Sequence, residues 1–259
     1  MDGKNYADVN AETFDRWVEN GWEWGVPITR EEYAAAGRGV WRVLLTPTKP
    51  VPSEWFAPFL KDGRLDGVKL LGLASGGGQQ MPIFAALGAT GTVLDYSDAQ
   101  LASERLVSER EGYAIDIVKA DMTKRLPFDD AAFDVIFHPV ANCYIEDVQH
   151  VWNECYRVLK PGGVLLAGMD SGLNFLIEKD EEPLIIKNKL PFNPLKDPVL
   201  METLKQNDDG VQFSHSLEEQ LGGQLKAGLR LTALFDDYNG SGALREYAPT
   251  FIATRAVKD

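Results

Sequence analysis

Short apolar runs alternate with helical patterns through the middle of the chain. The first run, residues 68–73, is followed by three consecutive glycines and then by an apolar segment with helical character, residues 81–87. Further runs of strand length lie at residues 92–95, 115–119, 133–137 and 164–169. Buried strands that alternate with helices are typical of an α/β sheet whose strands run parallel. The pattern therefore predicts an α/β domain built on a parallel sheet.

The last two apolar runs are too close together to be joined by a crossover helix. They span residues 230–236 and 250–257, and the link between them contains the turn-forming segment 238–242. Strands joined in this way pair antiparallel. We therefore predict a three-layer α/β fold with a seven-stranded, mostly parallel sheet and an antiparallel C-terminal hairpin.

Residues 1–60 precede the predicted sheet and are rich in tryptophan. Five of the six tryptophans of the chain lie there, namely Trp17, Trp22, Trp24, Trp41 and Trp55. We interpret residues 1–60 as an aromatic N-terminal arm that lies as a lid over the carboxyl ends of the strands, and residues 61–259 as the core. The alternative is that these large side chains only pack the arm onto the sheet.

A second segment, residues 171–214, interrupts the core. Its periodicity is weak, it carries prolines at 191, 194 and 198, and no helix is assigned to it. We predict an insertion before the last helix. Long insertions of this kind are often functional lids, and the alternative is a mobile surface loop.

Three helix starts are marked by residues that cap helices. Thr29 is followed three residues later by Glu32, which is the capping-box pattern. Asp98 and Asp147 are the predicted N-caps of two further helices. The glycine-rich segment 160–163 is predicted to be a turn before the fifth strand.

The charge of the chain limits its partners. Its 259 residues have a formal net charge of −13, from 26 Lys and Arg against 39 Asp and Glu. Because phosphate backbones and anionic membranes are bound by basic surfaces, this excess of acid argues against nucleic acid and membrane partners. No apolar run has the length of a membrane span, and the first residues do not resemble a signal peptide. We therefore expect a cytoplasmic protein; its oligomeric state is not indicated.

The two cysteines and three histidines form no zinc-binding pattern, and C-x-x-C is absent, so no metal site is predicted. Cys155 shares an apolar helical face with Val148, Val151 and Trp152 and is predicted to be a core thiol. Cys143 falls in a predicted loop, where we expect a reduced thiol near the site.

Candidate chemistry begins at the glycine turn, residues 74–78, between the first strand and its helix. Such a turn brings bare backbone close to a ligand and aims N–H groups at it, although a flexible glycine loop is the alternative. Asp95 follows about 20 residues later, where nucleotide-binding sheets place an acid that holds ribose hydroxyls. The dinucleotide fingerprint fails, because Met81 stands where its last glycine is required. A ribose-bearing ligand other than NAD or FAD is therefore indicated.

Five segments carry a resemblance to a known family: 70–78, Asp95, 120–122 with 126–128, 133–136, and the phrase Arg157–Gly163. In these segments the chain resembles the Rossmann-like (class I) S-adenosylmethionine (SAM)-dependent methyltransferases of the small-molecule type. The resemblance covers residues 68–170 and the closing strands. It implies the Rossmann-like methyltransferase fold, SAM as the cofactor, and methyl transfer to a small-molecule acceptor that the sequence does not identify.

The resemblance also implies which residues form the site. The implied cofactor-binding residues are Ala74, Ser75, Gly76, Gly78, Asp95, Tyr96, Asp121, Met122 and His138. In the family, the acid at Asp121 accepts a hydrogen bond from the adenine amino group. The expected acceptor-pocket residues are Trp22, Trp24, Trp41, Thr46, Asn142 and Tyr144. His138 is also the candidate general base, because histidine titrates near neutral pH, although its backbone alone could line the cofactor site.

Two positions depart from the family pattern. The family usually has an acid at Gly72 and a glycine at Ala74. These departures support one alternative function, a non-catalytic SAM-binding module. A nucleotide-dependent oxidoreductase on a similar sheet is a second alternative, against which the failed dinucleotide fingerprint and the antiparallel closing strands argue.

Overall fold

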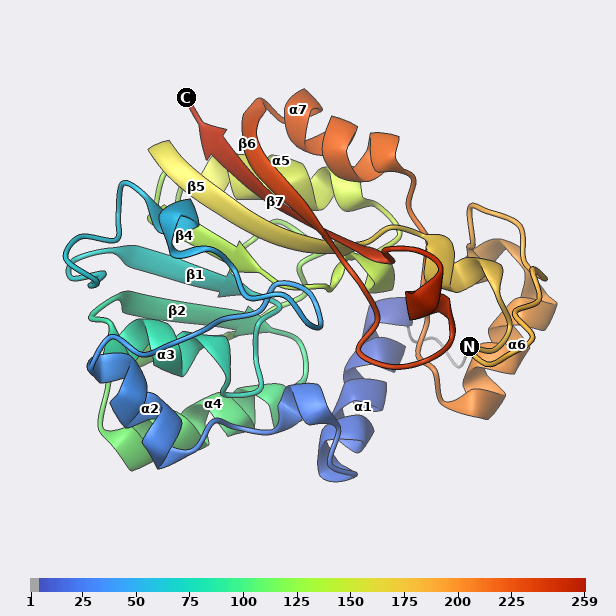
Figure 1. Ribbon diagram of the computed structural model, residues 1–259, viewed down its shortest axis with the longest axis horizontal. Helices are drawn as coiled ribbons and strands as arrows, with labels where there is room; N and C mark the ends of the chain where they lie inside the picture. The colour runs from blue at the N-terminus through green and yellow to red at the C-terminus, as the bar shows by residue number, and fades with distance from the viewer. Residues whose placement is uncertain (1–4) are drawn as a thin grey trace.

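The computed structural model describes residues 5–259, and its centre is a single seven-stranded sheet (Figure 1). The strands are β1 (Lys69–Leu73), β2 (Thr90–Asp95), β3 (Ile115–Lys119), β4 (Phe133–His138), β5 (Leu159–Asp170), β6 (Leu229–Asp237) and β7 (Phe251–Lys258). Their order is β3-β2-β1-β4-β5-β7-β6. Neighbouring strands from β3 to β5 pair parallel, whereas β7 pairs antiparallel with both β5 and β6. The predicted mostly parallel sheet with an antiparallel hairpin is confirmed.

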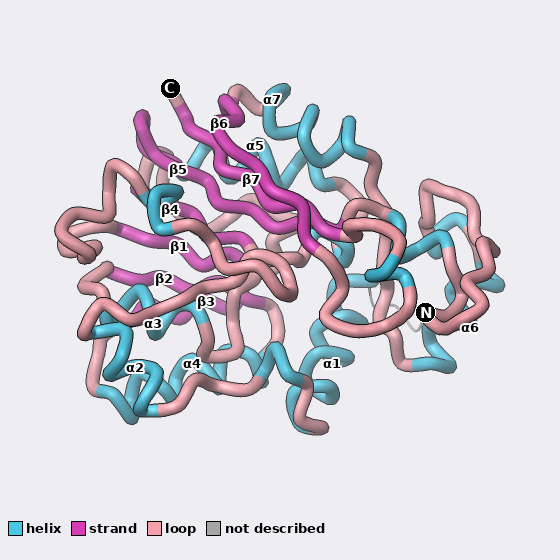
Figure 2. Tube along the Cα trace, viewed as in Figure 1, coloured by secondary structure: helices cyan, strands magenta, loops and turns pink. Residues whose placement is uncertain are grey.

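Helices cover both faces of this sheet, which gives the three predicted layers (Figures 1 and 2). They are α1 (Tyr6–Glu19), α2 (Arg30–Gly37), α3 (Gln80–Ala86), α4 (Asp98–Glu111), α5 (Val148–Val158), α6 (Pro198–Asn207) and α7 (Gly223–Lys226). Successive side chains of a strand point to opposite faces. Leu70 of β1 accordingly packs in the core that contains Phe84 of α3, and Leu71 in the core that contains Trp152 of α5.

The N-terminal arm divides into two parts with different roles. Its first part, with α1, lies beyond the carboxyl ends of the parallel strands (Figure 1). The second part packs on the sheet, because Val43, Leu45 and Phe56 belong to the same core as α3. Trp55 contacts Phe235 of β6, with ring centroids 5.1 Å apart. Part of the second half of the arm therefore belongs to the sheet core, so the arm does not act as a lid along its whole length.

The insertion at residues 171–214 contains α6, to which the sequence analysis assigned no helix. Pro198 occupies the first turn of α6, where the missing N–H of proline does no harm, and Asp197 accepts hydrogen bonds from two backbone N–H groups at the helix start. Leu204 of α6 packs with Phe175 and Phe192 in a small apolar cluster. The prolines of this segment thus start a helix and do not prevent one.

Two of the three predicted caps are confirmed. The side chain of Thr29 accepts a hydrogen bond from Glu32 N at 3.2 Å, and Asp147 caps α5. At α4 the cap is Ser97, because its hydroxyl oxygen accepts from Gln100 N, whereas Asp98 is already helical. The predicted turn at 160–163 falls inside the bounds of β5 as a bulge: Phe133 of β4 pairs with Leu159 and Val135 with Val164, and Gly162 between them has a φ of 77°.

Both cysteines are free and buried, and burial raises the pKa of each thiol. Cys155 lies in the core on the α5 side, as predicted. Among residues 5–259, no helix combines the length and the apolar character needed to cross a membrane. In the same part of the chain, no three His, Cys, Asp or Glu side chains are grouped to hold a metal ion.

A methyl group at Gly168 is expected to destabilise the protein by about 3 kcal/mol, at the upper end of ordinary overpacking effects. A Cβ at this position of β5 would overlap the carbonyl oxygen of Leu45 and lie 2.7 Å from its carbonyl carbon, and backbone atoms cannot move aside cheaply. Urea unfolding of Gly168→Ala measures the loss. Gly240→Ala is the matched control, because a Cβ there meets no atom within 4 Å. Equal stability of the two variants would contradict this account of how the arm packs on β5.

Candidate functional site

The glycine turn after β1 is held in place by its own backbone donors. Gly76 N donates to Asp95 Oδ2 at 3.1 Å, Gly77 N to the carbonyl oxygen of Gln100 at 3.0 Å, and Gly78 N to Glu104 Oε1 at 2.8 Å. These three N–H groups therefore bind β2 and α4, and they do not point at a ligand as the sequence analysis expected. Ala74, Ser75 and Gly76 at the start of the turn line the larger of the two cavities described next.

Two adjoining cavities open at the carboxyl ends of the parallel strands. The larger has a volume of about 1150 Å³ and the smaller about 100 Å³. The walls of both include Trp22, Ala74, Gln100, Val140 and Tyr144. Because they share these residues, the two cavities lie side by side, and Ala74 at the start of the glycine turn belongs to the walls of both.

The smaller cavity lies between α1 and the ends of β2 and β3. Its walls include Leu94, Asp95, Tyr96, Asp121 and Met122, and α1 adds Ala7, Asn10, Ala11 and Phe14. Hydrogen bonds fix α1 in this position: Tyr96 Oη donates to Asp8 Oδ1 at 2.8 Å, and Ser97 Oγ donates to Asp15 Oδ1 at 2.6 Å. The first part of the arm is thus a wall of the cavity.

Asp95 is buried at the junction of β2 and the glycine turn. Burial raises the pKa of its carboxyl group, and hydrogen bonds from the backbone N–H groups of Ser97, Gly76 and Tyr96 lower it. A carboxylate has about four acceptor positions. Three are used by these donors, so Oδ2, which accepts only from Gly76 N, retains room for one ligand hydroxyl.

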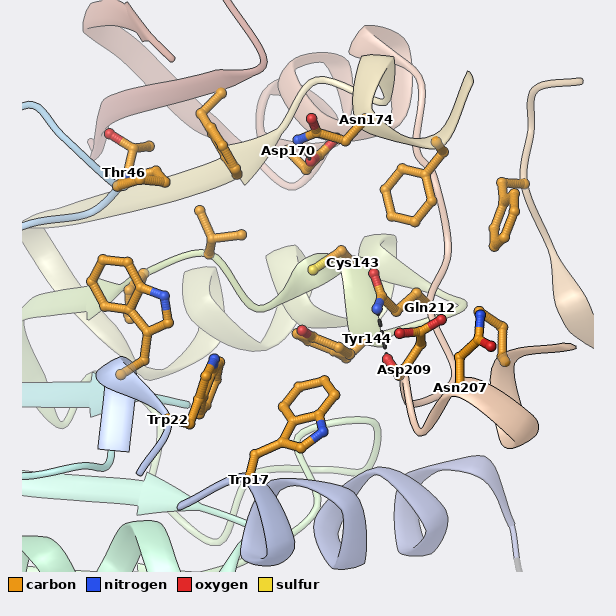
Figure 3. A pocket seen from close by; sticks show the side chains of 18 of the residues that line it. Trp17, Trp22, Thr46, Cys143, Tyr144, Asp170, Asn174, Asn207, Asp209 and Gln212 are labelled. Atoms are coloured by element: carbon orange, nitrogen blue, oxygen red, sulfur yellow. Dashed lines mark hydrogen bonds between the residues drawn. The ribbon is translucent and has the colours of Figure 1, made fainter. Parts of the chain in front are cut away.

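Aromatic side chains and a buried acid face each other across the larger cavity (Figure 3). Trp17 and Trp22 of the arm and Tyr144 line one side. Asp170, at the end of β5, and Asn174 lie on the opposite side. The insertion contributes further walls, among them Phe175, Phe192, Leu204, Asp209 and Gln212. The walls of the cavity therefore come from the arm, the sheet and the insertion together.

His138 and Asn142 do not line either cavity. The His138 ring is fully buried, with Nδ1 2.8 Å from the carbonyl oxygen of Leu73 and Nε2 2.9 Å from Asn142 Oδ1. Asn142 Nδ2 in turn donates to Gln220 Oε1 at 2.9 Å. Burial lowers the pKa of His138. With both ring nitrogens occupied inside the protein, His138 is placed to support the loop after β4 and not to receive a proton from an acceptor.

Of the other predicted site residues, some line a cavity and others do not. Ser75, Gly76, Trp24 and Thr46 line the larger cavity. Gly78 does not reach a cavity, because a Cβ there would press on Val107 and other atoms of α4 and of the arm. Trp41 packs against Phe56 on the sheet, with ring centroids 5.7 Å apart, and is likewise absent from both cavities.

Some residues of the site were missed in the sequence. Gln100 and the apolar face of α1 line the cavities without any motif that marks them. Asp170 could have been predicted as a site residue from the sequence. It directly follows the predicted fifth strand, just as Asp95 lies at the end of the second strand. The rule that ligands lie at the carboxyl ends of parallel strands applies equally to both.

The structure explains the two departures from the family pattern. A Cβ at Gly72 would lie 2.5 Å from the sulfur of Met81, so the Met81 side chain occupies the space that an acid would need. Ala74 has a φ of 49°, in the left-handed region where glycine is usual. Alanine at this position accepts a strain of roughly 1–2 kcal/mol.

Comparisons with known proteins agree with one another. A family model described as "Methyltransferase domain" matches residues 71–167. The uncharacterized methyltransferase YbaJ of Bacillus subtilis is 41% identical over 254 residues, which are 96% of this chain and 97% of that protein. A SAM-dependent methyltransferase structure from Mesorhizobium loti superposes with a TM-score of 0.60 at 19% identity, covering 80% of this chain and 98% of that one. At this identity, the last likeness shows the fold.

Proposed function

The chain belongs to the class I SAM-dependent methyltransferases, and from this premise we propose that it transfers the methyl group of SAM to a small-molecule acceptor bound in the larger cavity. One observation carries the proposal. The two cavities adjoin and share wall residues, Ala74 among them, so a cofactor in the smaller cavity would have its reactive end beside the larger one.

The residues present fit SAM. Ser75 and Gln100 line the larger cavity, and their oxygen atoms Oγ and Oε1 are buried without a hydrogen-bond partner within the described chain. Such groups are costly unless a ligand or water satisfies them. The smaller cavity has the mixture that adenosine needs, with acids at Asp95 and Asp121 and an apolar wall at Met122. We assign Asp95 to a ribose hydroxyl, Asp121 to the adenine amino group, and residues 74–76 to the methionine portion.

SAM supplies an electrophilic methyl group on a sulfonium. The protein's own contribution is to align an acceptor with that group in a cavity that has aromatic side chains in its wall. Alignment of this kind contributes roughly 7–11 kcal/mol in favourable intramolecular reactions. Trp22 and Tyr144 stand where the cavities join, and aromatic faces attract a sulfonium cation. His138 has no part in proton transfer, and a base is required only for an acceptor that arrives protonated.

A small-molecule acceptor is supported by the size and the lining of the larger cavity. Its volume is about 1150 Å³, and its walls come from the arm, the sheet and the insertion. The net charge of −13 also opposes a nucleic acid acceptor. A cytoplasmic location, in which Cys143 and Cys155 stay reduced, belongs to the same proposal.

Asp95→Ala should weaken binding of S-adenosylhomocysteine about tenfold or more, because hydrogen bonds to a charged group contribute roughly 1.5–3 kcal/mol. Isothermal titration calorimetry measures the change. Asp98→Ala is the matched control, since Asp98 is a nearby exposed acid that pairs with Lys119. Equal affinity of Asp95→Ala and the wild type would remove Asp95 from the site.

The same titrations separate the alternative functions. We expect SAM and S-adenosylhomocysteine to bind and NADH not to bind; the reverse would indicate an oxidoreductase. Formation of S-adenosylhomocysteine from SAM in the presence of a broad acceptor panel then tests catalysis. Tight binding of SAM with no turnover by any acceptor would favour the non-catalytic module.

A further inference from the structure

Asp170 is a buried carboxylate in the wall of the larger cavity, and it has no cationic partner among residues 5–259. Its side chain is 8% exposed. Oδ1 accepts a hydrogen bond from Gly172 N at 2.6 Å, and Oδ2 accepts from Asn174 Nδ2 at 2.7 Å. Both donors are neutral. Burial raises the pKa of Asp170 to about 6, and these two hydrogen bonds lower it. The group is therefore ionised at neutral pH, in a position where a lone charge is unfavourable.

The rest of the cavity does not supply the missing positive charge. Lys179 and Lys187 are the only cationic side chains in its wall among the described residues, and both are exposed. Lys187 already pairs with Glu178. Asp170 is the most deeply buried acid in the cavity wall, and no cation of the wall compensates its negative charge.

The side of the cavity opposite Asp170 is aromatic. Trp17, Trp22 and Tyr144 present their rings there (Figure 3). Aromatic faces favour apolar bodies and attract cations. A molecule with an apolar body and a positively charged end would therefore meet complementary surfaces on both sides.

We propose that the acceptor is a small molecule with a protonated nitrogen, an ammonium or amidinium group, and that Asp170 pairs with that nitrogen. The inference rests on the proposed function and names the substrate class of the same site. Asn174 holds the carboxylate in place from the far side by its hydrogen bond to Oδ2. The charge pair recognises the acceptor, and the atom that receives the methyl group is chosen separately by alignment with the cofactor. A nitrogen that is itself methylated must first release its proton.

Three probes of one shape test the charge preference. 2-Phenylethylamine, 2-phenylethanol and phenylacetate differ mainly in a terminal group that is cationic, neutral or anionic at pH 7.5. Each is titrated into the wild-type protein saturated with S-adenosylhomocysteine, with binding followed by calorimetry and by ligand-observed NMR. We expect the amine to bind at least tenfold more tightly than the alcohol, and the carboxylate to bind most weakly.

The variant Asp170→Asn should remove the preference and bind the amine no better than the alcohol. Glu178→Gln is the matched control, because it removes one carboxylate from the same wall where Lys187 already balances the charge. Affinity for S-adenosylhomocysteine is measured for each protein. If the wild-type protein does not bind it, the result refutes the proposed function and not the charge preference. With cofactor binding intact, an amine that binds no better than the alcohol would overturn the proposal. A preference for the amine that persists in Asp170→Asn would also overturn the proposal.

Discussion

Gly76→Val is expected to reduce affinity for S-adenosylhomocysteine by a factor of about 100 or more, well beyond the effect of losing one charged hydrogen bond. A Cβ at position 76 would lie 2.7 Å from Gln100 Cβ and 2.9 Å from Asp95 Oδ2. The two γ-methyl groups of valine add to this overlap. Both contacted residues line the cofactor cavity, so any relief of the clash distorts that cavity.

Calorimetry measures the affinity, and circular dichroism with a thermal melt shows whether the fold persists. Gly240→Val is the control, because a Cβ at that exposed turn meets no atom within 4 Å. If Gly76→Val binds S-adenosylhomocysteine like the wild type, the glycine turn serves only the fold.

A second large effect is expected from Glu104, a buried acid beneath the glycine turn. Its side chain has no solvent exposure; Oε1 accepts from Gly78 N at 2.8 Å, and Oε2 has no hydrogen-bond partner within the described chain. Burial raises the pKa of Glu104 from 4.5 to about 8, while the Gly78 N–H lowers it and the charge of Asp95 raises it further. The folded protein therefore keeps this proton at neutral pH, whereas the unfolded chain releases it.

The sign of the pH dependence follows from that difference. Between pH 4.5 and 8 the folded state binds more protons than the unfolded state, so the free energy of unfolding falls as pH rises. The stabilisation is fully present below pH 4.5 and is lost as pH rises through about 8. At roughly 1.4 kcal/mol per pH unit, the total loss is at most about 5 kcal/mol.

Urea unfolding at pH 5, 7 and 9 measures this loss. Glu104→Gln cannot ionise, so its stability should fall much less over that range and should exceed that of the wild type at pH 9. Glu109→Gln is the control, because Glu109 is exposed on the same helix. Parallel pH curves for the wild type and Glu104→Gln would show that Glu104 is already ionised in the folded protein.

The fold was predictable because its signals are local. Apolar runs of strand length and capping residues such as Thr29 and Asp147 act within a few positions, and the strands and caps they predicted are present. The cap of α4 was misplaced by one residue, because Ser97 and Asp98 are both good caps and the hydrogen bond to Gln100 N decides between them. Helix α6 was missed because it lacks a strong apolar period.

Site residues were predictable only where their position at the end of a strand determines whether they line a cavity. Asp95, at the end of β2, and Asp121, two residues beyond β3, line a cavity, as do residues 74–76 after β1. The orientation of a loop side chain depends on partners far away in the sequence. His138 and Asn142 point into the protein because Gln220, about 80 residues later, completes their hydrogen-bond network.

The roles of the tryptophans also depend on distant contacts. Trp17 and Trp22 line the larger cavity because Asp8 and Asp15 dock α1 on Tyr96 and Ser97. Trp41 and Trp55 pack on the sheet instead, against Phe56 and Phe235. Composition marked the arm as aromatic but could not divide it into these two parts.

A crystal structure of the protein with S-adenosylhomocysteine tests the central claim most directly. We predict adenosine in the smaller cavity under α1, with Asp95 at the ribose and Asp121 at the adenine amino group, and the sulfur facing Tyr144 and the larger cavity. A ligand bound elsewhere, or one whose sulfur faces away from the larger cavity, would contradict the account.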